Sequence, residues 1–302
     1  MNFTLWNAAV LPAAFVIVVL HLLLPGAGFW VGTVFALAGL ILFGIPHGSL
    51  DHVITEKTGD GSFSLIRFLV LYLLTMLVYA LFWVWLPAFS LLFFLLMSAW
   101  HFGETDLVTE NPKQTFSDIA ARFLQLTYGS LLLFGLLAND PQQTVDILSS
   151  LLVESSVLAG FLQLTETHSW LRFTEFYALG LRILLIRSAW FDQLRLALVL
   201  FAALFLPLLE GFLLYFCHHH AWVNLLRVKE KLYEAGQTGL RHMIKDMLPF
   251  SLISVVGIVI LVLSAPLWLA QVNPVLLFFI LISVLTLPHA GIMTRFYYKA
   301  AG

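Results

Sequence analysis

The sequence predicts an all-α fold, a polytopic transmembrane helical bundle of about ten spans that forms a single integral membrane domain over residues 1–302. Hydrophobic residues make up 61% of the chain and charged residues only 11%, which is typical of a protein whose solvent is lipid. The apolar residues occur in repeated runs of roughly 20, the length that a helix needs to cross the hydrocarbon layer. These runs lack the alternation of apolar and polar residues that a membrane β-barrel has.

Proline, glycine and charged residues separate the apolar runs and set the boundaries of the predicted spans. In chain order the spans are 5–24, 28–45, 64–86, 88–103, 118–138, 170–187, 190–208, 209–226, 248–270 and 274–292. The first run has no basic segment before it and no cleavage site after it, so we interpret it as a retained helix. The run 148–163 is short and carries Glu154 and several serines, so it is either an eleventh span or a helix at the interface.

Charge decides between ten and eleven spans, because cytoplasmic loops of membrane proteins are enriched in Lys and Arg. Ten spans with the N-terminus inside place 14 of the 15 Lys and Arg residues on the cytoplasmic side and leave only Arg172 outside. With an eleventh span, the best arrangement places 10 of these residues on one side of the membrane and 5 on the other. The sequence therefore predicts ten spans in the cell inner membrane, with both termini and the basic loop 227–247 in the cytoplasm.

Net charge and cysteine content exclude two further classes of protein. The formal net charge is -2, so the chain has no basic surface that neutralises a nucleic-acid backbone, and we expect no nucleic-acid partner. Cys217 is the single cysteine, which excludes an intramolecular disulfide.

Histidines lie near the cytoplasmic end of four predicted spans, at about the same membrane depth. They are His47, His101, the triplet His218, His219 and His220, and His289. Ionisable side chains at this depth normally face an interior cavity, and imidazole is the commonest neutral ligand of iron, zinc and copper. Four positions at one level favour a metal centre, although a proton relay made of histidines leaves a similar pattern.

Helix geometry limits which of these side chains meet. Successive helical positions differ by about 100°, so at most one or two residues of the triplet can reach a shared centre. Asn224 follows His220 by four residues and lies on the same face, where its amide can bond a water or weakly complete a coordination shell.

Asp51 and two prolines lie close in sequence to His47 and His289. Asp51 follows His47 by four residues, so it can orient that imidazole if a helix continues there. Pro46 precedes His47 and Pro288 precedes His289, which predicts broken helix ends at both histidines.

Four segments together resemble the Brp/Blh family of bacterial and archaeal membrane β-carotene 15,15′-dioxygenases. They are Gly44–His52 with its PHGxxD pattern, His101–Asp106 with HFGxxD, Tyr215–His220, and Leu287–His289. The segments occur in the family's order, and the resemblance extends from about residue 40 to 295.

The resemblance implies an Fe(II)-dependent enzyme that splits the central double bond of β-carotene, or a related carotenoid, with O2 to give retinal, often for a rhodopsin. His47, His101 and His220 match histidines regarded as iron ligands in that family, and they are the implied catalytic residues. Asn224 stands where the family pattern has a fourth histidine. We predict that His289 supplies this ligand, with His218 and His219 as alternatives.

Aromatic residues near the histidines are candidates for the lining of a substrate tunnel for an apolar polyene. They are Trp100, Phe102, Tyr215, Phe216 and Trp222. Most other aromatic residues in such a bundle contact lipid or pack between helices.

Three alternatives remain open at the level of sequence. A catalytically silent carotenoid- or retinal-binding member of the family is suggested by Asn224. A histidine-lined membrane transporter predicts inverted repeats, and none is evident. A di-iron hydroxylase or desaturase normally has HxxxH motifs, which this sequence lacks, and it would bind two metal ions per chain.

Overall fold

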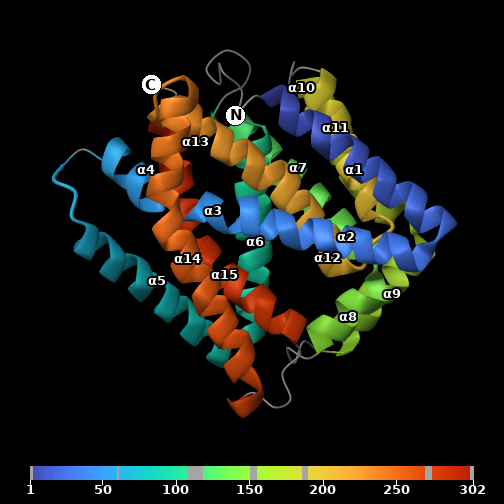
Figure 1. Ribbon diagram of the computed structural model, residues 1–302. Helices are drawn as coiled ribbons and strands as arrows, with labels where there is room; N and C mark the ends of the chain where they lie inside the picture. The colour runs from blue at the N-terminus through green and yellow to red at the C-terminus, as the bar shows by residue number, and fades with distance from the viewer. Residues whose placement is uncertain are drawn as a thin grey trace.

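The computed structural model describes residues 3–59, 61–107, 118–149, 155–185, 190–268 and 274–299, and this part of the chain is almost entirely helical. No strand occurs in these ranges, so the predicted all-α class is confirmed. The helices cross one another in a bundle, and the start of α1 (Phe3–Leu23) and the end of α15 (Pro274–Lys299) both lie in the upper part of Figure 1.

The helices follow one another with short connections. The first part of the chain forms α1, α2 (Pro25–Gly39), the π-helical turn η1 (Leu40–Gly44), α3 (Ile45–Gly48) and α4 (Asp51–Thr58). The middle forms α5 (Leu65–Trp85), α6 (Pro87–Asp106), α7 (Asp118–Asn139), α8 (Pro141–Ser149), α9 (Ser155–Thr167), the 3-10 turn η3 (Ser169–Phe173), α10 (Thr174–Leu185) and α11 (Trp190–Ala203). The last part forms α12 (Leu208–Tyr215), the π-helical turn η4 (Phe216–Ala221), α13 (Trp222–Leu232), α14 (Gly236–Trp268) and α15.

Six helical segments of the described chain are long and apolar enough to cross a membrane, which identifies a membrane protein. They are Pro25–Thr58, Leu65–Trp85, Pro87–Asp106, Ile119–Asn139, Gly236–Leu261 and Leu277–Tyr298. The predicted spans 170–187 and 190–208 correspond to α10 and α11, of 12 and 14 residues, which are shorter than the roughly 20 residues of a full crossing. The count of ten spans is therefore not confirmed.

The ambiguous run 148–163 falls on α8 and α9, and residues 150–154 lie outside the described part of the chain. The two described helices have 9 and 13 residues and pack against each other. The number of crossings made by this run and the cytoplasmic position of both termini therefore remain predictions.

Helices α6 and α7 approach each other closely because small residues line their contact. A Cβ atom at Gly103 would collide with the backbone carbonyl of Gln125, and one at Gly129 would collide with the carbonyl of Ala99. Small residues at such spacing let membrane helices pack backbone against backbone. This contact fixes the end of α6 that carries His101.

The two π-helical turns lie against each other in the centre of the bundle. Gly39 and Gly44 allow this approach, because a Cβ at Gly39 would be 2.9 Å from Cβ of Cys217 and one at Gly44 would be 3.1 Å from its Sγ. Single π-helical turns are frequent at functional sites, since the extra residue per turn redirects side chains. Here they place His47, just after η1, beside His220 within η4.

Pro46 and Pro288 differ in their effect on the helices, and a helix ends near Pro46 alone. The chain turns at Ser49 and Leu50, between α3 and α4, close to Pro46. The helix α15 continues through Pro288, so the predicted break at this proline is wrong. A proline inside a helix removes one backbone hydrogen bond without ending the helix when the flanking residues are held by packing.

Candidate metal centre

Four buried imidazole rings from four parts of the chain lie close together. The ring centroid of His47 lies 4.5 Å from that of His289 and 5.7 Å from that of His220. The centroid of His101 lies 5.2 Å from that of His289 and 4.8 Å from that of His220. The structure thus brings together all four histidines that the sequence analysis assigned to one centre, and we call them the histidine cluster.

Hydrogen bonds fix which ring nitrogen is free in two members of the cluster. Nδ1 of His47 donates to the carbonyl oxygen of Gly44 over 2.8 Å, and Nδ1 of His289 donates to Oδ1 of Asp51 over 2.8 Å. In a neutral imidazole the other nitrogen, Nε2, then carries the lone pair. Both Nε2 atoms are buried without a hydrogen-bond partner among the described residues, which is the state that a metal ligand requires.

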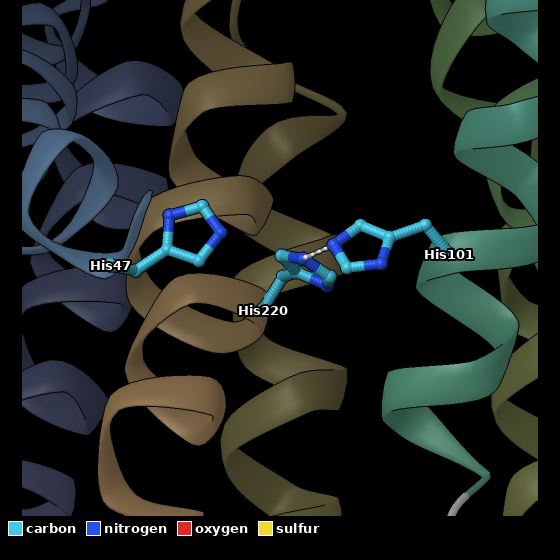
Figure 2. Close-up of side chains that lie close together, drawn as sticks. All are labelled: His47, His101 and His220. Carbon is cyan, nitrogen blue, oxygen red and sulfur yellow. Dashed lines mark hydrogen bonds between the residues drawn. The ribbon is translucent and has the colours of Figure 1, made fainter. Parts of the chain in front are cut away.

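The other two members, His101 and His220, face each other through their Nε2 atoms. Nε2 of His101 and Nε2 of His220 are 3.2 Å apart. Two imidazole nitrogens that share one metal at about 2.0–2.1 Å each lie about 3 Å apart. One ligand atom each from His47, His101 and His220 lies within 4.8 Å of the others, and Figure 2 shows the three rings gathered from three separate helical segments. The residues present therefore fit a metal ion.

Asp51 bonds to residues of two other helices, α15 and α5. Neither bond was predicted from the sequence. Instead of orienting His47, its carboxylate accepts from Nδ1 of His289 and, through Oδ2, from the hydroxyl of Tyr72 over 3.0 Å. The predicted contact with His47 fails because the chain turns between α3 and α4, which removes the four-residue helical register. Carboxylates commonly hold metal-bound histidines in this way and raise their basicity.

We expect Asp51→Asn to weaken metal binding by about 10–100-fold, since the neutral amide accepts less strongly from His289. Tyr72→Phe is the matched control, because it removes the second bond to Asp51 and leaves the bond to His289 in place. Competitive titration with a chelator measures both variants. Equal affinity of Asp51→Asn and the wild type would contradict the assigned role of Asp51.

Asn224 lies at the edge of the cluster with its amide fixed by a tyrosine. The hydroxyl of Tyr297 donates to Oδ1 of Asn224, so the amide nitrogen Nδ2 is directed at Nε2 of His220, 3.2 Å away. An amide NH2 donates hydrogen bonds and does not ligate metals. In this orientation Asn224 contacts His220 and offers the cluster no ligand atom.

The other two histidines of the triplet make their contacts elsewhere. His218 stacks on Phe35 with a centroid distance of 4.1 Å, and its Nε2 lies 3.1 Å from the Phe35 carbonyl oxygen. Nδ1 of His219 accepts from Arg195 over 3.2 Å, and its Nε2 lies 3.5 Å from Oδ1 of Asp106. The helical rotation between successive residues separates the three side chains, and the contacts of His218 and His219 offer no support for either as a replacement ligand.

Two of the five predicted tunnel residues border the cluster. The ring of Phe102 lies edge-on to His220 at 4.6 Å, and the ring of Phe216 stacks on His220 at 5.7 Å. Tyr215 instead bonds to Asp106, and the ring of Trp222 packs against Phe43 at 5.2 Å. Trp100 is partly exposed. Phe102 and Phe216 give the cluster an apolar wall.

A buried ionic network beside the cluster was missed by sequence reasoning. Asp106 accepts from the hydroxyls of Tyr128 and Tyr215, each over 2.8 Å. Asp192 pairs with Arg182 over 2.7 Å and with Arg195 over 2.5 Å. The charge pattern predicts that both arginines lie at the cytoplasmic face, whereas Arg182 is 3% and Arg195 0% exposed inside the bundle. A charge in a short apolar helix is a signal for such a network, because a buried charge requires a partner.

An apolar helical bundle that buries four neighbouring imidazoles defines a class of integral membrane protein with a candidate metal site built from histidines. A family model described as "Beta-carotene 15,15'-dioxygenase" matches residues 38–297. The chain belongs to this family, which confirms the resemblance seen in the motifs.

A curated relative agrees with this assignment over part of its length. The chain is 39% identical over 89 residues to "Beta-carotene 15,15'-dioxygenase" of uncultured marine bacterium 66A03, and the aligned stretch covers 28% of this chain and 32% of that protein. No solved structure matches the chain.

Proposed function

We propose that the protein cleaves the central double bond of β-carotene, or a related carotenoid, with O2 to give two molecules of retinal. In this reaction one C=C bond breaks, and each of its two carbons takes one oxygen atom of O2 to form an aldehyde. Family membership supports this activity. The observation that carries the proposal is the histidine cluster, with two unpaired Nε2 atoms in an apolar interior.

The proposed cofactor is Fe(II), held by His47, His101, His220 and His289. When bound, it supplies a site for O2 that neutral imidazoles leave partly open. Neutral ligands suit this role because burial of uncompensated charge in the bundle is costly. Asp51 and the Gly44 carbonyl orient two of the rings.

The other residues of the site bind and orient the polyene. Phe102 and Phe216 present aromatic faces beside His220, against which an apolar conjugated chain packs without leaving polar groups unpaired. The burial of the cluster excludes water. The substrate comes from the bilayer, and the product retinal passes to a retinal-binding protein such as a rhodopsin.

A second candidate is a carotenoid- or retinal-binding protein without turnover. The position of Asn224 favours it, because this residue replaces the histidine expected from the family pattern and directs an amide at His220. Turnover alone separates the two candidates.

The test is expression in cells that make β-carotene, followed by chromatography of pigments and retinal. We expect loss of β-carotene with formation of retinal in cells that carry the wild-type chain and not in cells that carry His220→Ala. Retention of all β-carotene, with the protein present in the membrane, would support the silent binding protein instead.

A further inference from the structure

A partly enclosed apolar cavity of about 60 Å³ lies inside the bundle, apart from the histidine cluster. Its walls come from α5, α6, α7, α8, α12 and α15, and among them are Trp83, Leu95 and Phe212. Of the lining residues only Ser98 and Thr144 carry a hydroxyl, and that of Thr144 is already bonded to the Leu137 carbonyl over 2.7 Å. A cavity of this kind stays dry and takes an apolar occupant.

The cavity lies at a consistent distance from the cluster on three helices. Its wall residues Phe94, Phe212 and Phe279 precede His101, His220 and His289, respectively, by seven to ten residues. At about 1.5 Å per residue, this places the cavity about 10–15 Å from the cluster along each helix.

The helix α5 also has one residue beside the cluster and another in the wall of the cavity. Its wall residue Trp83 follows Tyr72, which bonds to Asp51 beside the cluster. The four helices therefore agree that the cavity lies toward the opposite end of the bundle from the cluster.

Aromatic rings form a continuous wall between the cavity and the cluster. Phe212 stacks on Phe216 with a centroid distance of 5.7 Å and an interplanar angle of 7°. Phe216 in turn stacks on His220 at 5.7 Å. The three residues recur every four positions and so lie on one face of α12 and η4. This row of aromatic rings connects the wall of the cavity to the cluster.

The volume of the cavity limits how much of a carotenoid molecule it can hold. A volume of about 60 Å³ corresponds to about four to six waters at roughly 10–15 Å³ each. This is the space of one methylated six-membered ring, and it is far too small for a whole polyene.

We propose that this cavity binds one terminal ring of the carotenoid and thereby sets which double bond reaches the histidine cluster. The inference rests on the proposed function. A polyene anchored by one end ring runs along Phe212 and Phe216 and presents its middle, about half its length away, at His220. Apart from the Ser98 and Thr144 hydroxyls and the Trp83 indole N–H the wall is hydrocarbon, which suits the largely hydrocarbon end ring of a carotenoid.

The test compares two neighbouring leucines of α6. Leu95 lines the cavity, whereas Leu96 is 51% exposed on the outer surface of the helix. Leu95→Phe fills the cavity, and Leu96→Phe adds the same ring on the surface. The readouts are equilibrium binding of β-carotene to the purified protein, followed by its visible absorbance, and the identity of the aldehyde products.

We expect Leu95→Phe to weaken β-carotene binding by about tenfold and to raise the share of unequal cleavage products, while Leu96→Phe stays within about twofold of the wild type. Equal β-carotene affinity of Leu95→Phe and Leu96→Phe would overturn the inference. Binding that follows the expected pattern without any retinal would uphold the inference and reject the proposed function.

Discussion

Replacing His289 by alanine should remove most of the bound iron and abolish retinal formation. Its Nε2 is unpaired, its ring lies 4.5 Å from that of His47, and Asp51 holds its Nδ1. Loss of a ligand costs more than the 10–100-fold that loss of a supporting hydrogen bond costs. Iron analysis of the purified protein measures the effect. His242→Ala, at an exposed position of α14, is the control and should keep its iron.

The same measurement on Asn224→His separates two accounts of the fourth ligand. We expect no gain in iron or retinal, because we assign the fourth ligand position to His289 and a further imidazole would crowd the space beside Nε2 of His220. The substitution also removes the bond from Tyr297 to Asn224. A wild-type protein without iron that gains it in Asn224→His would show that His289 does not act as a ligand.

Replacing Arg195 by methionine should destabilise the fold by about 3–5 kcal/mol, the cost of breaking a buried ion pair by removing one partner. Arg195 is fully buried and contacts both Asp192 and His219. Its loss leaves the Asp192 carboxylate with Arg182 as its remaining ion-pair partner. Thermal unfolding in detergent micelles measures the loss.

Arg241→Met provides the matched control for the buried arginine, since Arg241 is exposed on α14. We expect its free energy of unfolding to change by less than about 0.5 kcal/mol. Because His219 adjoins His220, Arg195→Met should also lower the iron content. Unfolding of Arg195→Met at the wild-type temperature would show that the network contributes nothing to stability.

The helical class and the grouping of the histidines could be predicted from sequence because each depends on a local signal. Apolar runs indicate helices whatever their partners, and span ends at a common depth bring His47, His101, His220 and His289 to one level. The count of spans depends on more than composition. The helices α10 and α11 carry Arg182 and Arg195 as partners of a buried network, so their charges are not simple markers of the cytoplasmic face.

Pairings between distant residues could not be predicted. Asp51 and His289 are 238 residues apart, and only the packing of α15 on α4 brings them together. The π-helical turns η1 and η4 depend likewise on the approach of Gly39 and Gly44 to Cys217. A four-residue spacing therefore suggested the wrong partner for Asp51, because the chain turns before α4 begins.

The metal content of the wild-type protein tests the central claim most directly. The protein is purified from cells supplied with iron, and metal and protein are quantified in the same sample. One histidine cluster predicts one metal ion per chain, with zinc or nickel replacing part of the iron because imidazole sites select poorly among these ions. Two ions per chain would favour a di-iron enzyme, and a folded protein without any metal would contradict the metal centre.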